Sequence, residues 1–227
     1  MKDPSSTNSD NRTIVSIKNF SRILRFDDGI AIAREILDGF RNRENYLFIF
    51  LETSEVGLYI RNDCRVFYLK NIPDQLWCGF IRERFTSSGK AIQTEACRLL
   101  VQNTEGNPYY TQMLSLQAWN RTMGFCTKAT IEEAVSDILQ IYHLQFDSLT
   151  ASLTPSQVSI LKAIINEEHA MTSKETMQKY GFASSPAVNR ARGAVIEKGI
   201  IYKTKESLTF INPFYRLWLI KKYFALP

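Results

Sequence analysis

The residues able to perform covalent or metal chemistry are few and widely separated in this chain. There are two histidines, His143 and His169, and four cysteines at positions 64, 78, 97 and 126. No two cysteines form a C-x-x-C pair, and their density is far below that of a disulfide scaffold, so we expect reduced, mostly buried thiols. The sequence therefore nearly excludes a zinc cluster and a histidine-based triad. No residue resembles a nucleophile with its base.

A different chemistry, attraction of a polyanion, is indicated by the charge distribution. The chain has 227 residues and a formal net charge of +5. From Thr154 onward, the last 74 residues hold 11 basic and 5 acidic residues, against 17 and 18 in the preceding part. This excess of positive charge in a segment of small-domain size favours duplex DNA or an acidic protein surface as a partner. A solvated basic surface without a partner is the alternative.

The elements that carry these basic residues begin at recognisable helix starts. Capping boxes or prolines at the first helical position predict three helices, which begin at Thr154–Gln157, Thr172–Glu175 and Ser185–Pro186, the last ending at Gly199. Two strand-like segments follow, Ile200–Lys203 and Ser207–Ile211. Three helices and a hairpin in this order predict a winged helix-turn-helix.

The third of these helices is the predicted recognition helix. Val188, Ala191 and Val195 fall on its inward face, which leaves polar side chains able to face outward, while Lys221 and Lys222 add attraction to a phosphate backbone. The predicted nucleic-acid-binding residues are Asn189, Arg190, Arg192, Lys203 and Lys205.

The first 70 residues follow the pattern of an α/β layer. Residues 1–12 are a polar tail that we expect to be disordered. Strand-like segments at Thr13–Ile17, Tyr46–Leu51 and Arg65–Leu69 flank a helix expected over 29–42. The composition thus predicts strand, helix, strand, strand.

From Pro73 to about Phe146 the pattern is helical. Leu76 to Phe85 mark one helix, and Thr94 starts a second. Asn107-Pro108 starts a third, with Asn as N-cap, and Thr130–Glu133 reads as the capping box of a fourth that continues to a break at Leu149–Leu153. These four helices predict a lid or a bundle.

Several motifs together resemble the C-terminal half of an archaeal-type STAND ATPase, a branch of the AAA+ P-loop proteins, over about residues 13–219. The motifs are Gly106-Asn107-Pro108-Tyr109-Tyr110, Phe80–Phe85 with Gly89-Lys90, Leu153-Thr154 with Gln157, and Asn212-Pro213-Phe214 with Trp218-Leu219. The resemblance implies an α/β plus α fold: an incomplete P-loop NTPase core of three strands, a helical lid and a C-terminal winged helix-turn-helix. It also implies that Gly106, Asn107, Pro108 and Tyr109 lie against a bound nucleotide.

The phosphate and metal chemistry of that family is missing from this chain. Gly89-Lys90 has Arg84 where the first glycine of a phosphate loop belongs and Ala91 where a magnesium-binding hydroxyl belongs, so it reads as a helix end. Lys18-Asn19 stand where the family places Asp-Glu to hold Mg²⁺ and orient water, and Glu55 stands where related proteins tend to have a basic side chain. ATP and Mg²⁺ are therefore implied by the resemblance only, and we expect neither to bind this chain tightly by itself.

In P-loop folds of this type, the strand before the phosphate loop lies between the second and third strands found here. Without it, Tyr46–Leu51 and Arg65–Leu69 pair directly, or an unpaired slot and an exposed apolar face invite another chain. We therefore expect the first 70 residues to be only marginally stable alone.

Together these features predict a tail at 1–12, a partial P-loop core at 13–72, a helical lid at 73–149 and a winged helix domain at 150–227. The leading hypothesis is a degenerate or truncated STAND ATPase that does not hydrolyse nucleotide and binds DNA or a protein through its winged helix. The alternatives are the C-terminal half of an active ATPase whose P-loop half is missing from this chain or supplied in trans, and a plain protein-interaction module. The longest apolar run, Leu47–Leu51, is far shorter than the roughly 20 residues of a membrane span, and no signal peptide precedes it, so we expect a cytosolic protein without membrane contact.

Overall fold

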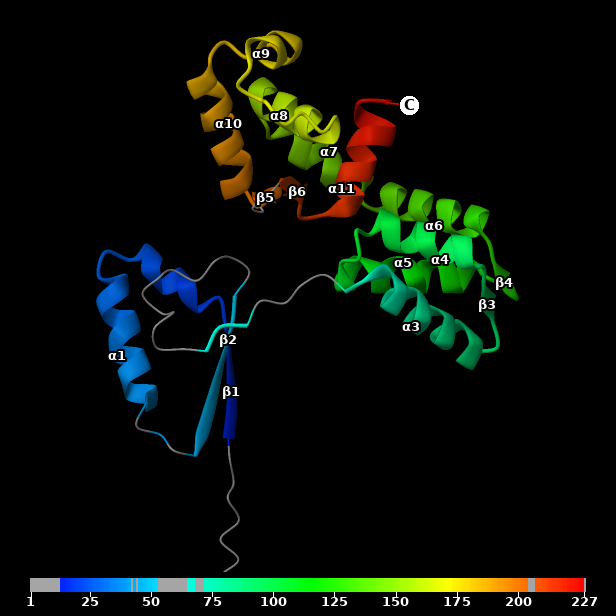
Figure 1. Cartoon of the computed structure of the whole chain (residues 1–227), viewed down its shortest axis with the longest axis horizontal. Helices are drawn as coiled ribbons and strands as arrows, with labels where there is room; N and C mark the ends of the chain where they lie inside the picture. The colour runs from blue at the N-terminus through cyan, green and yellow to red at the C-terminus, as the bar shows by residue number, and fades with distance from the viewer. Residues whose placement is uncertain are drawn as a thin grey trace, which may run out of the picture. The chain divides into compact units, whose positions relative to one another are not determined.

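The computed structural model describes residues 13–41, 43, 45–52, 65–67, 72–203 and 207–226. It contains two compact units, Met1–Leu69 and Lys70–Pro227 (Figure 1). Each unit has its own apolar core and is described by itself.

The first unit contains a two-stranded parallel sheet. β1 (Thr13–Lys18) pairs with β2 (Tyr46–Leu51), with Thr13 opposite Tyr46 and Lys18 opposite Leu51. A 3₁₀ turn, η1 (Phe20–Arg25), and helix α1 (Gly29–Arg41) connect the strands. Parallel strands need such a crossover because a tight hairpin can join only antiparallel ones.

Only one face of this sheet is covered in the described part of the unit. Phe20, Ala33 and Leu37 form its buried cluster, and the rings of Phe40 and Phe48 stack 3.9 Å apart. The other face is exposed and largely apolar, with Ile14 65%, Leu47 54%, Ile49 40% and Leu51 44% accessible, and it also carries Ser16 and Lys18. A parallel sheet normally has both faces buried, so this surface is unusual.

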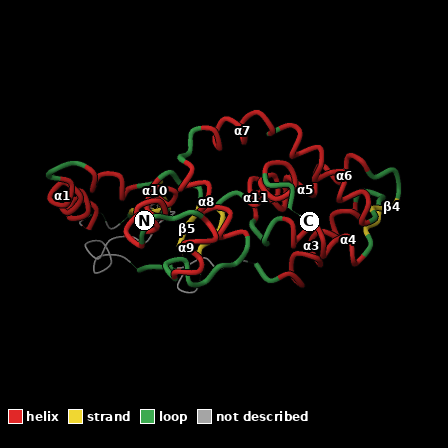
Figure 2. Tube along the Cα trace, turned by 90° about the horizontal axis from the view of Figure 1, so that it is seen from above, coloured by secondary structure: helices red, strands yellow, loops and turns green. Residues whose placement is uncertain are grey.

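The second unit is mainly helical, and its strands are short (Figure 2). It begins with α3 (Asp74–Ser87), β3 (Ala91–Ile92), α4 (Thr94–Asn103), α5 (Pro108–Arg121), β4 (Phe125–Cys126) and α6 (Lys128–Ile141). β3 and β4 pair in parallel, and the four helices enclose a continuous core that includes Leu100, Leu114 and Ile131. Cys78, Cys97 and Cys126 are buried free thiols, as expected, whereas Cys64 lies outside the described residues.

The remaining elements form four helices, a hairpin and a C-terminal helix that ends in a π-helical turn. They are α7 (His143–Ala151), α8 (Pro155–Ile165), α9 (Lys174–Tyr180), α10 (Ser185–Glu197), β5 (Ile201–Lys203), β6 (Leu208–Phe210), α11 (Pro213–Trp218) and the π-helical turn η2 (Leu219–Tyr223). Trp218 is buried, and its indole Nε1 donates to Nδ1 of His143 at 3.0 Å, which joins α11 to α7.

Several sequence predictions about individual elements need correction. Arg65–Phe67 have no regular secondary structure, while Tyr68 and Leu69 lie outside the described residues, as does Glu55. β2 pairs with β1 along one edge, and among the described residues no strand pairs with its other edge. Of the two alternatives, direct pairing of β2 with a strand at 65–69 is therefore not seen in the described part of that segment.

Two helix boundaries also differ from the prediction. Thr127, not Thr130, is the N-cap of α6: its hydroxyl accepts from the Thr130 amide, and the Thr130 side chain accepts from the Thr127 amide. The expected single helix to Leu149 is divided at Tyr142 into α6 and α7. The α9 cap is Ser173, one residue after the predicted start.

Candidate functional site

The predicted recognition helix, α10, is held against α8 by apolar packing. Val188 and Val195 are fully buried and Ala191 is 7% exposed, which is the expected inward face. The Ser184 hydroxyl accepts from the Ala187 amide at 3.4 Å, and Pro186 lies in the first turn. These local signals fix the start of α10 and therefore which side chains face outward.

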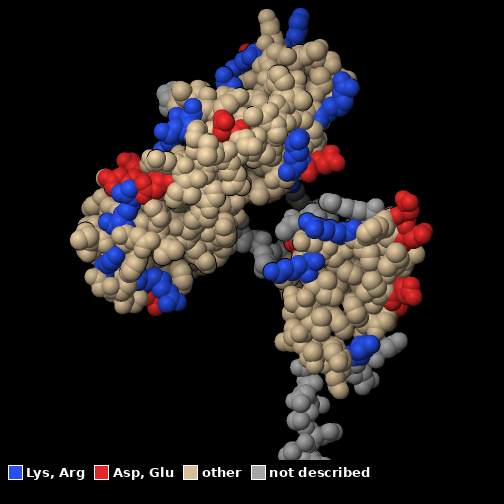
Figure 3. Space-filling model, turned by 180° about the vertical axis from the view of Figure 1, so that it is seen from behind, with Lys and Arg blue, Asp and Glu red and all other residues tan. Residues whose placement is uncertain are grey.

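The predicted DNA-binding residues do not share one surface. Asn189 and Arg190 are exposed on α10, but Arg192 is partly buried and donates from Nη2 to Oδ1 of Asn189 at 2.9 Å. A separation of two residues along a helix is a rotation of about 200°, so Arg190 and Arg192 lie on opposite flanks of α10. Lys203 is exposed at the end of β5, and Lys205 lies outside the described residues. In the view of Figure 3, basic side chains are spread over the second unit instead of forming one continuous patch.

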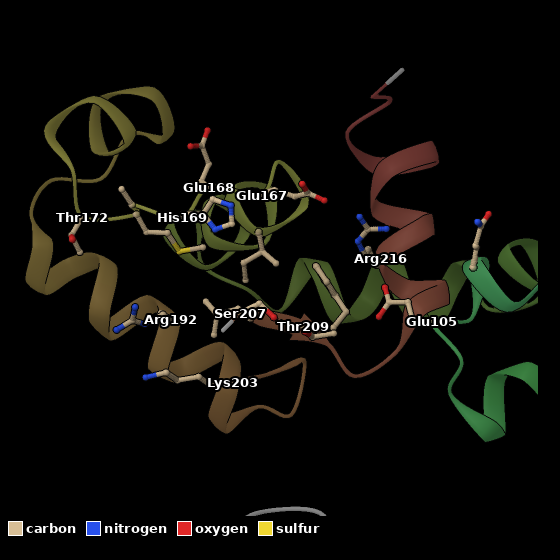
Figure 4. A pocket seen from close by; sticks show the side chains of 16 residues that line it. Glu105, Glu167, Glu168, His169, Thr172, Arg192, Lys203, Ser207, Thr209 and Arg216 are labelled. Carbon is tan, nitrogen blue, oxygen red and sulfur yellow. Dashed lines mark hydrogen bonds between the residues drawn. The ribbon is translucent and has the colours of Figure 1, made fainter. Parts of the chain in front are cut away.

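Arg192 and Lys203 meet in a groove of about 640 Å³. Its walls come from α10, the hairpin, the segment after α8, the end of α4 and α11 (Figure 4). Arg192 and Lys203 lie at one end, and Glu105 and Arg216 lie at the other. Of the described residues, Arg192, Lys203 and Arg216 form no ion pair within 4.0 Å. No local sequence signal marks Glu105 or Arg216 as groove residues, because only tertiary packing brings the end of α4 and α11 to this groove.

The acidic side chains of the groove differ in their surroundings. Glu168 accepts from Lys179 Nζ at 2.6 Å and from the Tyr180 hydroxyl at 3.0 Å, and these hydrogen bonds lower its pKa. Although Glu105 is exposed as a residue, desolvation of its carboxyl raises its pKa, and the charge of Arg216 opposes that shift. Glu168 is therefore already paired with a cation, whereas Glu105 forms no ion pair within 4.0 Å with any residue that the structure describes.

The predicted nucleotide motif at the start of α5 is largely used to build the fold. Gly106 has a φ of +65°, and its carbonyl accepts from Trp77 Nε1 at 2.9 Å in a buried position. Oδ1 of Asn107 accepts from the amides of Tyr109 and Tyr110, which caps α5. Pro108 and Tyr109 remain exposed, and Tyr109 borders a small cavity of about 170 Å³.

The residues present fit a nucleotide only in part and do not fit Mg²⁺. Pro108 and Tyr109 offer an accessible apolar surface on which an adenine ring could pack. Within the described residues, however, no group of three or more His, Cys, Asp or Glu side chains could hold a metal ion. At the end of β2, Glu52 accepts from the Ser21 amide and hydroxyl and is thereby occupied.

Gly89 and Lys90 form a helix end, as the sequence predicts. Gly89 has a φ of +76° after α3, the conformation that glycine accepts at a helix terminus. Lys90 Nζ donates to the Trp119 carbonyl at 2.7 Å and lies 3.7 Å from the centre of the Trp119 ring. This lysine therefore fixes the start of β3 to the end of α5 and does not face a phosphate cradle.

Comparisons with known proteins agree with this architecture. Residues 144–221 match the family described as "Probable winged helix domain". No curated protein matches the chain by sequence. Among solved structures, the chain is similar to a Walker-type ATPase of Pyrococcus abyssi, with 14% identity and a TM-score of 0.60, covering 92% of this chain and 63% of that one.

Two other structural matches are weaker. A mutant of RuvB from Thermotoga maritima has 10% identity and a TM-score of 0.48, covering 90% of this chain and 69% of that one. The DNA clamp loader delta protein of Bacillus subtilis has 14% identity and a TM-score of 0.29, covering 80% and 66%. Scores below 0.5 do not establish a shared fold, so the ATPase of Pyrococcus abyssi carries the comparison.

The chain therefore has a fold similar to that of a P-loop ATPase, with a winged helix domain in its C-terminal part. It spans 63% of the length of the Pyrococcus protein. Domains of the winged helix class commonly bind nucleic acid or other proteins. In the part of the chain that the structure describes, no helix has the length and apolar character needed to cross a membrane.

Proposed function

We propose that this chain is a member of the STAND branch of P-loop ATPases that does not hydrolyse nucleotide by itself and that binds duplex DNA through its winged helix. The observation that carries the DNA assignment is the outward surface of α10. Asn189 and Arg190 are exposed there, opposite a buried face of Val188, Ala191 and Val195. An amide and a guanidinium on an exposed helix are suited to base edges and phosphates in a major groove.

The groove flank of α10 supplies a second, separate contribution. Arg192 and Lys203 form no ion pair within the described part of the chain, so their charge is available to a phosphate backbone beside the helix. We assign base contact to Asn189 and Arg190 and backbone attraction to Arg192, Lys203 and Lys205. This division follows from the opposite flanks that Arg190 and Arg192 occupy.

The lack of hydrolysis rests on the residues at the end of β1. Lys18 and Asn19 follow the strand where the resembling family has its two acids, and an ammonium group can neither hold Mg²⁺ nor activate water. Asn19 has a φ of 55°, and its amide donates to the Leu51 carbonyl, so it helps to join β1 to β2. ATP would at most pack against Pro108 and Tyr109, and we expect no tight binding of ATP or Mg²⁺ by this chain alone.

DNA binding is tested by fluorescence anisotropy with a labelled random-sequence duplex at low salt. Arg190→Glu should weaken binding about tenfold or more, because it removes a cation and adds a like charge beside the phosphates. Arg98→Glu is the matched control, since Arg98 is exposed on α4 and the substitution changes the net charge equally. If both variants weaken binding equally, net charge alone explains the loss, and DNA binding is not assigned to α10.

A second candidate function is favoured by the exposed sheet face of the first unit. Ile14, Leu47 and Ile49 are 65%, 54% and 40% exposed on a parallel sheet, and the chain spans 63% of the similar ATPase. A separate α/β segment carrying a P-loop would cover this face and supply the missing phosphate site. The chain would then be the C-terminal half of an active ATPase.

Calorimetric titration with ATP and Mg²⁺ separates the two candidates. The leading proposal predicts no saturable heat for the chain alone and none after addition of a candidate P-loop half. The second predicts saturable binding once that half is present, lost when Pro108→Gly and Tyr109→Ala are combined.

A further inference from the structure

The groove beside α10 runs along the backbone edge of strand β6. Ser207, Leu208, Thr209 and Phe210 all line it. Successive side chains of a strand point to opposite faces, so four consecutive residues can border one cavity only if the cavity lies at the edge of the strand. Figure 4 shows Ser207 and Thr209 between the two charged ends of the groove.

The hydrogen-bonding pattern of the hairpin leaves this edge open. β6 pairs with β5 alone in the described part of the chain, with Ile201 opposite Phe210 and Lys203 opposite Leu208. The Ile211 amide donates to the Ile200 carbonyl, so that pair is hydrogen-bonded. Because hydrogen-bonded and non-hydrogen-bonded pairs alternate in an antiparallel ladder, the backbone groups of Leu208 and Phe210 point away from β5 and toward the groove.

The opposite wall does not fill this edge. Residues 166–172, between α8 and α9, contain no strand, and Glu167 to Thr172 border the groove from the side facing β6. The groove is about 640 Å³, which is enough for a short extended segment and within the roughly 300–1,000 Å³ of ligand sites. Its floor is apolar, with Met171 and Phe210 at 8% and 3% exposure.

The charges of the groove indicate what such a segment would carry. Arg192 and Lys203 lie together at one end (Figure 4) without an ion pair among the described residues. At that end an incoming chain would meet two cations. At the other end Arg216 lies near Glu105 (Figure 4), and Glu167 also lines the groove, so the excess of positive charge is confined to the end with Arg192 and Lys203.

We propose that the groove is a docking site for an extended acidic peptide segment of a partner protein. The segment adds as a strand to β6, bonds to the backbone groups of Leu208 and Phe210, and places a carboxylate between Arg192 and Lys203. Its alternate side chains are apolar and cover Met171. The site shares Arg192 and Lys203 with the backbone contribution proposed above and lies apart from the base-contact residues Asn189 and Arg190. Peptide binding there does not depend on DNA binding.

The probe is a phage-displayed library of random decapeptides, selected on the full chain and compared with selection on Leu208→Pro. Proline removes the amide that faces the groove and leaves the ladder to β5 intact, because Leu208 lies in a non-hydrogen-bonded pair. We expect peptides that are enriched on the native chain only, with an acidic residue and alternating apolar residues. Binding of duplex DNA to Leu208→Pro should be unchanged, which separates this test from that of the proposed function.

Two further measurements use the enriched peptide. They remain valid even if Leu208→Pro does not fold. N-methylation of its alternate backbone amides should weaken binding at least tenfold, because a strand pairs through those groups. Combining Arg192→Glu with Lys203→Glu should also weaken it at least tenfold, and replacing the acid of the peptide by lysine should restore binding to that double variant.

Three results would overturn the proposal. They are a selection that yields no peptide dependent on Leu208, equal binding of the N-methylated peptide, and displacement of every enriched peptide by inorganic phosphate at constant ionic strength. The last would assign the groove to small anions.

Discussion

Trp77 shows how one buried hydrogen bond maintains the lid motif. Its indole Nε1 donates to the Gly106 carbonyl, and both groups are buried. Gly106 has a φ of +65°, a backbone conformation that disfavours any residue with a side chain. The turn that presents Pro108 and Tyr109 therefore depends on a donor from another helix.

Trp77→Phe should lower the free energy of unfolding by about 1–3 kcal/mol, because it leaves the Gly106 carbonyl without its donor in a buried position. Urea unfolding followed by circular dichroism measures this. Trp119→Phe is the matched control, since the Trp119 indole donates to Ser88 Oγ at an exposed site, and it should cost less than about 1 kcal/mol. An equal loss of stability in the two variants would show that the hydrogen bond to the Gly106 carbonyl does not stabilise the fold more than the exposed bond to Ser88 does.

Asp137 predicts a pH dependence of stability. Hydrogen bonds from Arg121 and Gln117 lower the pKa of its carboxyl in the folded chain. A group with a depressed folded pKa stabilises the fold above its ordinary pKa of about 3.9, and that contribution is lost as the pH falls through the folded pKa. Native chain and Asp137→Asn should thus differ most near neutral pH and converge below about pH 4.

Urea unfolding of both proteins across that range measures the difference. Glu133→Gln, which alters the other partner of Arg121 at an exposed position, should change stability less. A constant gap between native chain and Asp137→Asn down to pH 3 would argue against this ion pair as the source.

The secondary-structure elements that could be predicted from the sequence are those whose boundaries are set by neighbouring residues. The starts of α5 and α8 were predicted because Asn107 and Thr154 carry their capping information within three residues. The cap of α6 was missed because Thr130 has both a glutamate three positions later and a hydroxyl that serves Thr127.

Features formed between distant elements could not be read in this way. The division at Tyr142 carries no proline or glycine, so no local signal marks it. The groove joins the end of α4 to α10, the hairpin and α11. Glu105 at the end of α4 and Arg216 on α11 are more than 100 positions apart in the chain. The sequence indicated that Arg190 and Arg192 could both face outward, but the partial burial of Arg192 and its hydrogen bond to Asn189 are visible only in the structure.

The cap of α6 gives a test of an element boundary. Thr127→Ala should destabilise the fold by about 1 kcal/mol, because the Thr130 amide loses its acceptor. Thr127→Ser keeps the hydroxyl and should be nearly neutral, as measured by thermal or urea unfolding. If Thr127→Ala leaves stability unchanged, Thr127 is not the residue that caps α6.

At the scale of the whole molecule, we expect the first unit to be less stable than the second. The first has a buried cluster of Phe20, Ala33 and Leu37 under a sheet with one exposed face, whereas the second has an extensive continuous core. A small core leaves little stabilisation after the loss of chain entropy.

Limited trypsin digestion of the full chain should therefore cleave within residues 13–41 before any site in 72–203. Mass spectrometry of the first fragments identifies the sites. Equal resistance of the two regions would contradict a marginal first unit and weaken the case for a covering partner.

The central claim is that the winged helix of this chain binds duplex DNA through α10, and the dependence of affinity on salt tests it most directly. We expect the logarithm of the binding constant to fall linearly with the logarithm of salt concentration. Arg192→Gln, which removes one assigned backbone contact on α10, should reduce the slope by about 0.9, the value of one phosphate contact. An affinity that does not respond to salt, or a slope that Arg192→Gln leaves unchanged, would contradict the claim.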